Sequence, residues 1–288
     1  MPRVSQRYAA PPGDGARALR SAPPVGVAAE VVSAAAAPVP GWGAAAVRVA
    51  AAVPVLGSGA EAVRVAREFA DSIAGGAIER DRSGAGPARE LAALDASGLL
   101  GITVPRRYGG ADVSACVLAE VVRVIAAADP AIARLAQSHF LLVGVLAAVG
   151  TPSQRHRLLT DVLAGARLSN GMAERGGQHA QDLKTRLSGG GPGMWLTGRK
   201  YYCSGALTAR WIGVTALDEA DRLVLVFVER DAPGVHLDED WNQRGTVSGG
   251  VRFDDVAVDP CLVIPYYRAF EAPPQVGALP PNHGQICG

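Results

Sequence analysis

The chain of 288 residues is poor in lysine and in aromatic residues. Only Lys184 and Lys200 carry a side-chain amine, since every other basic residue is arginine, and Phe, Trp and Tyr together make up 5% of the sequence. The net charge is only +1. A balanced charge gives no electrostatic basis for binding nucleic acid or an anionic membrane. We therefore expect neither as a partner.

Cysteine is scarce and is not arranged for a metal. The four cysteines, Cys116, Cys203, Cys261 and Cys287, form no CxxC pair and no ligand spacing with the histidines. This pattern excludes a sequence-encoded zinc site and favours a reduced, cytoplasmic setting. Charge, proline or glycine interrupts each apolar run before it reaches membrane-spanning length, so we expect a soluble protein.

The residue pattern changes along the chain. Residues 1–56 are rich in alanine, proline and valine, which predicts a disordered, low-complexity extension. Helical periodicity follows over 57–165, and alternation of period two over 166–265. Residues 266–288 are proline-rich and predict an irregular tail. The expected fold is α+β, with an N-terminal helical bundle followed by a β barrel or sandwich.

Individual elements can be predicted from apolar spacing and from capping residues. The predicted helices run from Ser58 past Ile78, from Pro87 to Gly98, from Ser114 to Ala128, from Ala131 to Val149, and from Thr151 to Ala164. The predicted strands are Leu168–Met172, Leu183–Leu187, Met194–Thr197, Trp211–Leu217, Leu223–Val228 and Val251–Phe253.

The segment from Gly198 to Ala206 carries the most chemistry. It follows Trp195–Thr197 and leads into Trp211–Thr215, so the region has the pattern of a strand, a turn and a second strand. The segment holds a lysine, two adjacent tyrosines and a serine. On a strand, Tyr202 and Ser204 would point to the same face. Such a pair can cover a flat heterocycle and hydrogen-bond its edge, as a flavin site requires. A hairpin at the solvent edge is the alternative.

Three phrases in order resemble the acyl-CoA dehydrogenase superfamily. They are Gly98–Pro105 with the turn at Tyr108-Gly109-Gly110, then Gly198-Arg199-Lys200, then Phe253–Pro260. The resemblance runs from about Phe69 to Ala269. It implies flavin bound between the β domain and a C-terminal helical bundle, usually in a tetramer. That bundle, which carries the catalytic base of the dehydrogenases, has no counterpart among these residues, so no general base can be named.

One branch of the superfamily is most similar. His139-Phe140, the phrase Tyr202–Leu207 and Trp241 resemble flavin-dependent monooxygenases of sulfur compounds, such as dibenzothiophene and sulfur-acquisition oxygenases. The resemblance implies reduced FMN from a separate reductase, and a small organosulfur substrate. Two alternatives stay open: an FAD-dependent acyl-CoA dehydrogenase, and a non-catalytic fragment.

The resemblance also implies the cofactor-binding residues. Met172 and Ala173 match the segment that wraps the pyrimidine edge of the flavin; Ala173 stands where Thr or Ser is common, so backbone N–H groups would serve. Tyr202 matches the aromatic residue that covers the flavin. Ser204 matches the hydroxyl that approaches the reactive ring nitrogen, and is therefore a catalytic candidate as well.

His139 is the second catalytic candidate. It lies on a very apolar predicted helix, and the resemblance implies a histidine that donates to the flavin hydroperoxide. The alternative is a core histidine with both ring nitrogens satisfied. Among the neighbours of the site, Cys203 is expected to pack in the β core, Lys200 to face solvent or pair with an acid, and Glu174 to be structural.

Overall fold

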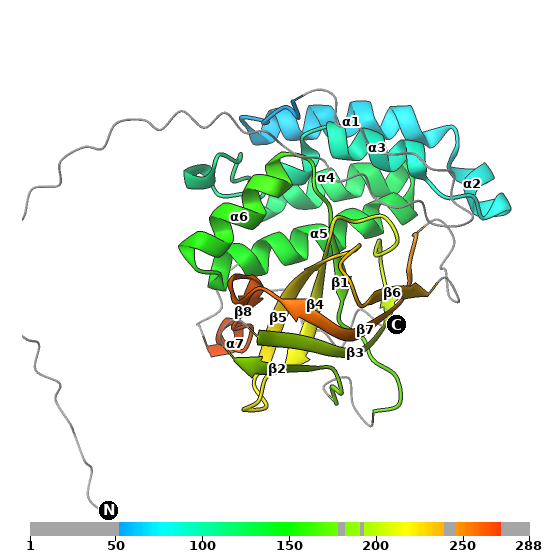
Figure 1. Cartoon of the computed structure of the whole chain (residues 1–288). Helices are drawn as coiled ribbons and strands as arrows, with labels where there is room; N and C mark the ends of the chain where they lie inside the picture. Colours follow the sequence, from blue (N-terminus) through cyan, green and yellow to red (C-terminus); the bar gives the residue numbers. More distant parts are fainter. Residues whose placement is uncertain (1–51, 178–181, 191–192, 239–245, 272–288) are drawn as a thin grey trace, which may run out of the picture. The chain divides into compact units, whose positions relative to one another are not determined.

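The computed structural model describes residues 52–177, 182–190, 193–238 and 246–271. Helices come first along this part of the chain and strands second (Figure 1). This order confirms the predicted α+β class. The extension over 1–51, Trp241, Cys287 and the end of the expected tail lie outside the described residues.

The helical region contains six α-helices and two short 3₁₀ turns within the described residues. The helices are α1 (Gly59–Ala74), α2 (Ala77–Ser83), α3 (Ala88–Ala96), α4 (Ala115–Ala128), α5 (Pro130–Val149) and α6 (Pro152–Leu163). The 3₁₀ turns are η1 (Leu99–Gly101) and η2 (Arg106–Tyr108).

Side-chain caps define where these helices begin. Ser58 and Ser114 accept the N–H of the third residue of α1 and α4. Thr151 opens α6 with a full capping box, in which its hydroxyl and Gln154 satisfy each other's backbone N–H. The single helix predicted from Ser58 past Ile78 is two helices, α1 and α2, in the structure. The helical conformation is interrupted at Gly75 and Gly76.

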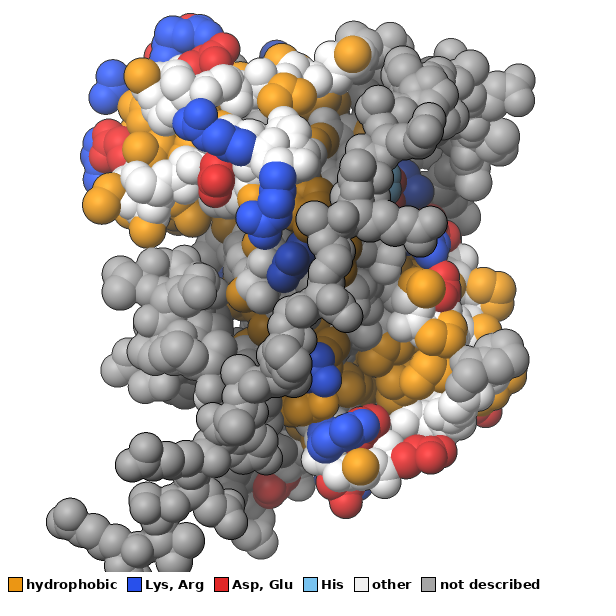
Figure 2. All heavy atoms as spheres, turned by 90° about the vertical axis from the view of Figure 1, so that its left-hand side faces the viewer, with side chains coloured by type: hydrophobic (Ala, Val, Ile, Leu, Met, Phe, Trp, Pro, Cys, Tyr) orange, Lys and Arg blue, Asp and Glu red, His pale blue; other side chains and the backbone are white. Residues whose placement is uncertain are grey.

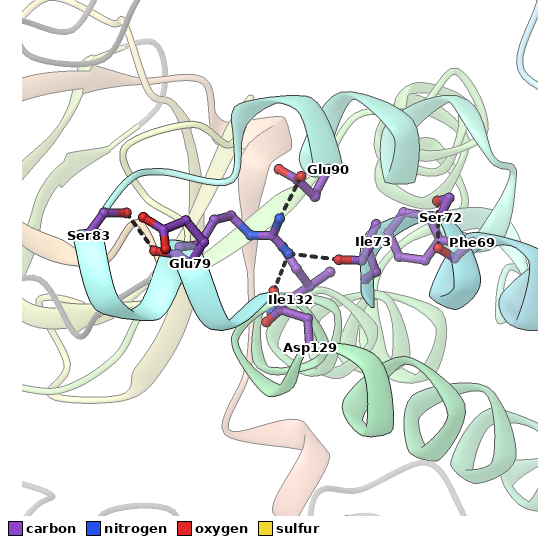
Figure 3. A network of polar contacts seen from close by, with 9 residues as sticks. Phe69, Ser72, Ile73, Glu79, Ser83, Glu90, Asp129 and Ile132 are labelled. Atoms are coloured by element: carbon purple, nitrogen blue, oxygen red, sulfur yellow. Dashed lines mark hydrogen bonds and ion pairs between the residues drawn. The ribbon is translucent and has the colours of Figure 1, made fainter. Parts of the chain in front are cut away.

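Ile73, Glu90 and Asp129, which Figure 3 labels, all accept hydrogen bonds from the guanidinium of Arg80 in α2. The guanidinium donates to Glu90 Oε1 and Asp129 Oδ2, both at 2.7 Å, and to the Ile73 carbonyl at 3.2 Å. The other oxygen of Asp129 accepts the N–H groups of Ala131 and Ile132, so it caps α5. One buried cation therefore fixes the end of α1, α2, α3 and the start of α5.

The strands form one mixed sheet. They are β1 (Leu168–Gly171), β2 (Arg186–Gly190), β3 (Gly193–Cys203), β4 (Trp211–Leu217), β5 (Leu223–Glu229), β6 (Val235–Asp238), β7 (Gly249–Val258) and β8 (Val263–Ile264). The order is β6-β7-β3-β2-β4-β5-β8, with β1 parallel to β4. A 3₁₀ turn, η3 (Pro260–Leu262), and a short helix, α7 (Arg268–Glu271), complete the described elements. The helix α7 corrects the prediction of an irregular tail from residue 266, because Tyr266 and Ala269 are buried in the apolar cluster around Trp211.

The sheet differs from the predicted strands in three ways. The strands β3 and β7 are longer than the predicted Met194–Thr197 and Val251–Phe253. The strands β6 and β8 are short and were not predicted, because four and two residues are too few to show a period of two. The predicted strand over 183–187 lies instead at 186–190. Backbone N–H groups of residues 184 and 185 bind Glu174, which keeps them out of the ladder.

α5 packs against the sheet at β1 and β4 (Figure 1). Its side chains belong to two apolar clusters, one among the helices and one with Trp211 and Phe227. The approach is so close that a Cβ on Gly213 would lie 2.8 Å from Leu142 Cδ2. A side chain at this point of β4 would therefore displace the Leu142 side chain, so glycine favours the close approach of the helix to the sheet.

α5 is also long and apolar enough, by length and composition alone, to cross a membrane. Most of its residues are buried inside the protein, as in the core helix of a globular fold. On the face drawn in Figure 2, acidic, basic and apolar side chains are interspersed, in keeping with the net charge of +1.

We expect Arg80→Met to lower the free energy of unfolding by about 3 to 5 kcal/mol, because it leaves two carboxylates with little solvent access unpaired. Arg64→Met is the control, since Arg64 and its partner Glu68 are more than half exposed; it should cost less than about 0.5 kcal/mol. Urea denaturation of both variants measures this. Equal losses would contradict a structural role for the Arg80 network.

Candidate functional site

The end of β1 and the end of β3 are joined by hydrogen bonds. Asn170 Oδ1 accepts the Ser204 N–H at 3.1 Å, and Ser169 Oγ donates to the Ser204 carbonyl at 2.9 Å. Beyond β1, the Tyr201 N–H donates to the Ala173 carbonyl at 2.9 Å. The structure therefore brings together four residues predicted to bind a cofactor: Met172, Ala173, Tyr202 and Ser204.

The prediction that Tyr202 and Ser204 point to the same face of a regular strand is wrong. Tyr202 has φ of 56°, in the left-handed region, and the pairing of β3 with β7 shifts register between Lys200 and Cys203. A bulge of this kind breaks the pleat that places alternate residues on one face. Tyr202 is 40% exposed, whereas Ser204 lies in the turn after β3 and is 5% exposed.

Arg175 lies over both tyrosines. Its Cζ is 4.4 Å from the ring centre of Tyr201 and 4.8 Å from that of Tyr202, which is cation–π contact. Its Nε donates to the Tyr202 hydroxyl at 3.1 Å. The ring predicted to cover a flavin is thus itself held by a guanidinium.

The hydroxyl of Ser204 is the uncommitted polar group of the cluster. The backbone N–H and carbonyl of Ser204 are both bonded to β1, which fixes the residue in place. Its Oγ makes no hydrogen bond to any residue in the described part of the chain. A fixed hydroxyl without a partner in the described part of the chain can donate to or accept from a ligand.

His139 is buried between α5, η1 and β1. Its Nε2 is 3.0 Å from the Leu100 carbonyl, and its Nδ1 accepts the Leu168 N–H at 3.1 Å. Nδ1 is therefore unprotonated, and Nε2 carries the proton that it donates to Leu100. These contacts favour the alternative of a satisfied core histidine, and a catalytic role for His139 stays a prediction.

Burial governs the ionisation of this histidine. It lowers the pKa of His139 from 6.5 to about 4; the bond to the Leu100 carbonyl opposes the shift and the charge of Arg167 adds to it. Arg167 is itself paired with Asp95 at 2.5 Å. His139 is consequently neutral at physiological pH.

Lys200 is completely buried and paired with an acid, which decides between the two expectations for it. Its Nζ donates to Glu174 Oε1 at 2.6 Å and to Thr215 Oγ1 at 3.1 Å. Burial acts to raise the pKa of Glu174, but the bonds from Lys200 and from the Lys184 N–H outweigh it, and the pKa lies below its usual range. Glu174 is therefore ionised at neutral pH, and its role is structural.

Cys203 behaves as expected of a core residue. It is inaccessible to solvent within an apolar cluster of the sheet, and burial raises the pKa of its thiol to about 12. A thiol of this kind is not a nucleophile at neutral pH.

The sequence alone did not reveal three residues of the site: Asn170, Arg175 and Thr215. Each acts through a contact with a residue 27 to 43 positions away along the chain. No local pattern encodes such contacts.

Comparison with known proteins identifies the helical region. Residues 59–166 match the model of the acyl-CoA dehydrogenase N-terminal domain. Over these residues the chain is similar to the acyl-CoA dehydrogenases, as the resemblance in the sequence predicted. A dibenzothiophene monooxygenase of Rhodococcus erythropolis is 31% identical over 214 residues, which are 71% of this chain and 51% of that protein.

Two further members of the superfamily belong to the same group of relatives. A protein of Pseudomonas putida named probable FMNH2-dependent monooxygenase SfnC is 30% identical over 67% of this chain and 49% of its own length. The FMN-bound structure of TdsC from Paenibacillus sp. A11-2 superposes with a TM-score of 0.66 at 29% identity, over 70% of this chain and 53% of TdsC. The chain thus spans about half the length of these relatives.

The pKa of His139 predicts how stability depends on pH. The folded state favours the neutral form of His139. The contribution of this preference to the free energy of unfolding is therefore complete above about pH 6.5 and is lost as the pH falls toward 4. We expect a loss of about 2 kcal/mol between pH 7 and pH 5.

His139→Gln should be less stable at pH 7, because two hydrogen bonds are disturbed, yet lack this part of the pH dependence. Urea denaturation of both proteins at the two pH values measures the difference. The same pH dependence in wild type and variant would contradict a buried neutral imidazole.

Proposed function

We propose that the chain is a flavin-dependent monooxygenase that acts on a small organosulfur compound, with reduced FMN supplied by a separate reductase. The observation that carries this proposal is the grouping of Met172, Ala173, Tyr202 and Ser204 at the ends of β1 and β3. The names of the relatives, dibenzothiophene monooxygenase and FMNH2-dependent monooxygenase, support the reaction class.

The residues present fit a flat aromatic cofactor. The 40% exposed ring of Tyr202 offers a stacking surface, and the fixed hydroxyl of Ser204 offers a hydrogen bond nearby. The carbonyls of Met172 and Ala173 are bonded to Thr215 and Tyr201, so the N–H groups of this segment are the ones proposed to meet the pyrimidine edge.

In the proposed reaction, reduced FMN supplies two electrons to dioxygen, so that one oxygen atom passes to sulfur and the other leaves as water. The chain's own part is to stack, orient and exclude water. Ser204 would orient the ring. His139, which is neutral, would offer its Nε2–H as a hydrogen-bond donor only after Nε2 releases the Leu100 carbonyl.

We further propose a cytoplasmic enzyme that works as a homo-oligomer, a tetramer in the full-length fold, as is usual in the superfamily. An acyl-CoA dehydrogenase would bind FAD in place of FMN. Flavin preference therefore separates the two activities.

Titration of the purified chain with FMN and with FAD, followed by flavin fluorescence, tests the proposal. We expect saturable binding with a preference for FMN. Preference for FAD would favour the dehydrogenase, and absence of binding by the folded chain would overturn the proposal for this chain.

Variants locate the binding surface. Tyr202→Leu and Ser204→Ala should each raise the Kd for FMN about tenfold, the loss of one stacking or hydrogen-bonding contact. Trp195→Leu is the matched control, because Trp195 is a similarly exposed aromatic residue, 45% exposed, on the same strand. A Kd raised equally by all three substitutions would contradict the proposed surface.

A further inference from the structure

Lys200 is connected to both ends of the segment Met172–Ala173–Glu174. Its Nζ donates to Glu174 directly at 2.6 Å. It also donates to Thr215 Oγ1 at 3.1 Å, and the Thr215 hydroxyl in turn donates to the Met172 carbonyl at 3.2 Å. The ammonium group of Lys200 thus binds, directly or through Thr215, the residues on both sides of Ala173.

The Met172 carbonyl and the Ala173 N–H belong to the same planar peptide group and point in opposite directions. The hydroxyl that fixes the carbonyl therefore also fixes the direction of the N–H. Consecutive hydrogen bonds polarise one another in an interior of low dielectric. The relay from Lys200 through Thr215 therefore fixes the Met172–Ala173 peptide from one side, while the backbone of Ala173 pairs with Tyr201 of β3 on the other.

Glu174 secures the other end of the segment. Its Oε2 accepts the Lys184 N–H at 2.7 Å, and its Oε1 accepts the Thr185 N–H at 3.2 Å. Lys200 is fully buried and Glu174 has 7% side-chain exposure. Since a buried charge without its partner is costly, the ion pair holds one arrangement of the loop.

Resting on the function proposed above, we infer that Lys200 and Thr215 are positioning residues for the flavin: they hold the Met172–Ala173 peptide against β3, at the position proposed for the pyrimidine edge. Neither residue touches the cofactor. Their effect passes through the backbone of Ala173, the position at which the superfamily commonly has a hydroxyl side chain and this chain has none.

Thr215→Val tests this inference, because it removes the hydroxyl while keeping the shape of the side chain and the Lys200–Glu174 pair. We expect the Kd for FMN to rise about tenfold and the visible absorption bands of bound FMN to shift. Thr215→Ser keeps the hydroxyl and should restore both the Kd and the spectrum. Far-UV circular dichroism shows whether each variant is folded.

Thr185→Val is the matched control. Thr185 is fully buried in the same sheet region, but its Oγ1 has no hydrogen-bond partner in the described part of the chain. The same chemical change there should leave the Kd within about twofold. The double variant Lys200→Met with Glu174→Gln removes both charges together, and should weaken FMN binding as Thr215→Val does.

The outcomes are distinct. If wild type binds FMN and Thr215→Val binds it as tightly as Thr185→Val does, the inference fails and the proposed function stands. A Thr215→Val chain that is unfolded also overturns the inference, because the hydroxyl then serves the fold rather than the ligand. A folded wild type that binds neither flavin overturns both.

Discussion

The structure depends on α5 because this helix is apolar around most of its circumference and must be buried on several sides. Its first half packs among the helices, and its second half packs on the sheet against Trp211 and Phe227. Gly213 allows the close approach, and Asp129 satisfies its first N–H groups. The helix α5 therefore belongs to the apolar cores of both the helical region and the sheet, and it holds the two together.

The same helix explains the state of His139. A polar side chain within such a helix must find its partners in the core, and it finds them in the backbone of η1 and of β1. The imidazole thereby links three elements that are far apart in sequence. The imidazole is neutral because it is buried in this packing, which lowers its pKa.

Much of the fold could be predicted from the sequence. Caps such as Ser114 and Thr151, with apolar spacing behind them, mark helix starts to within a residue or two. The site was less predictable. The left-handed φ of Tyr202 arises from a register shift against β7, and the burial of Lys200 depends on Glu174 and Thr215 on other segments. Such features are set by tertiary pairing, which a local pattern does not contain.

The scarcity of lysine gives the buried Lys200 an unexpected use. The chain has two side-chain amines; Lys184 is exposed, and Lys200 has no solvent contact. An amine-reactive reagent would therefore acylate Lys184 at once, and Lys200 only when the loop after β1 separates from the sheet. The rate at which Lys200 is acylated, measured by peptide mass spectrometry, would then report how often this loop opens, with no change to the amino-acid sequence.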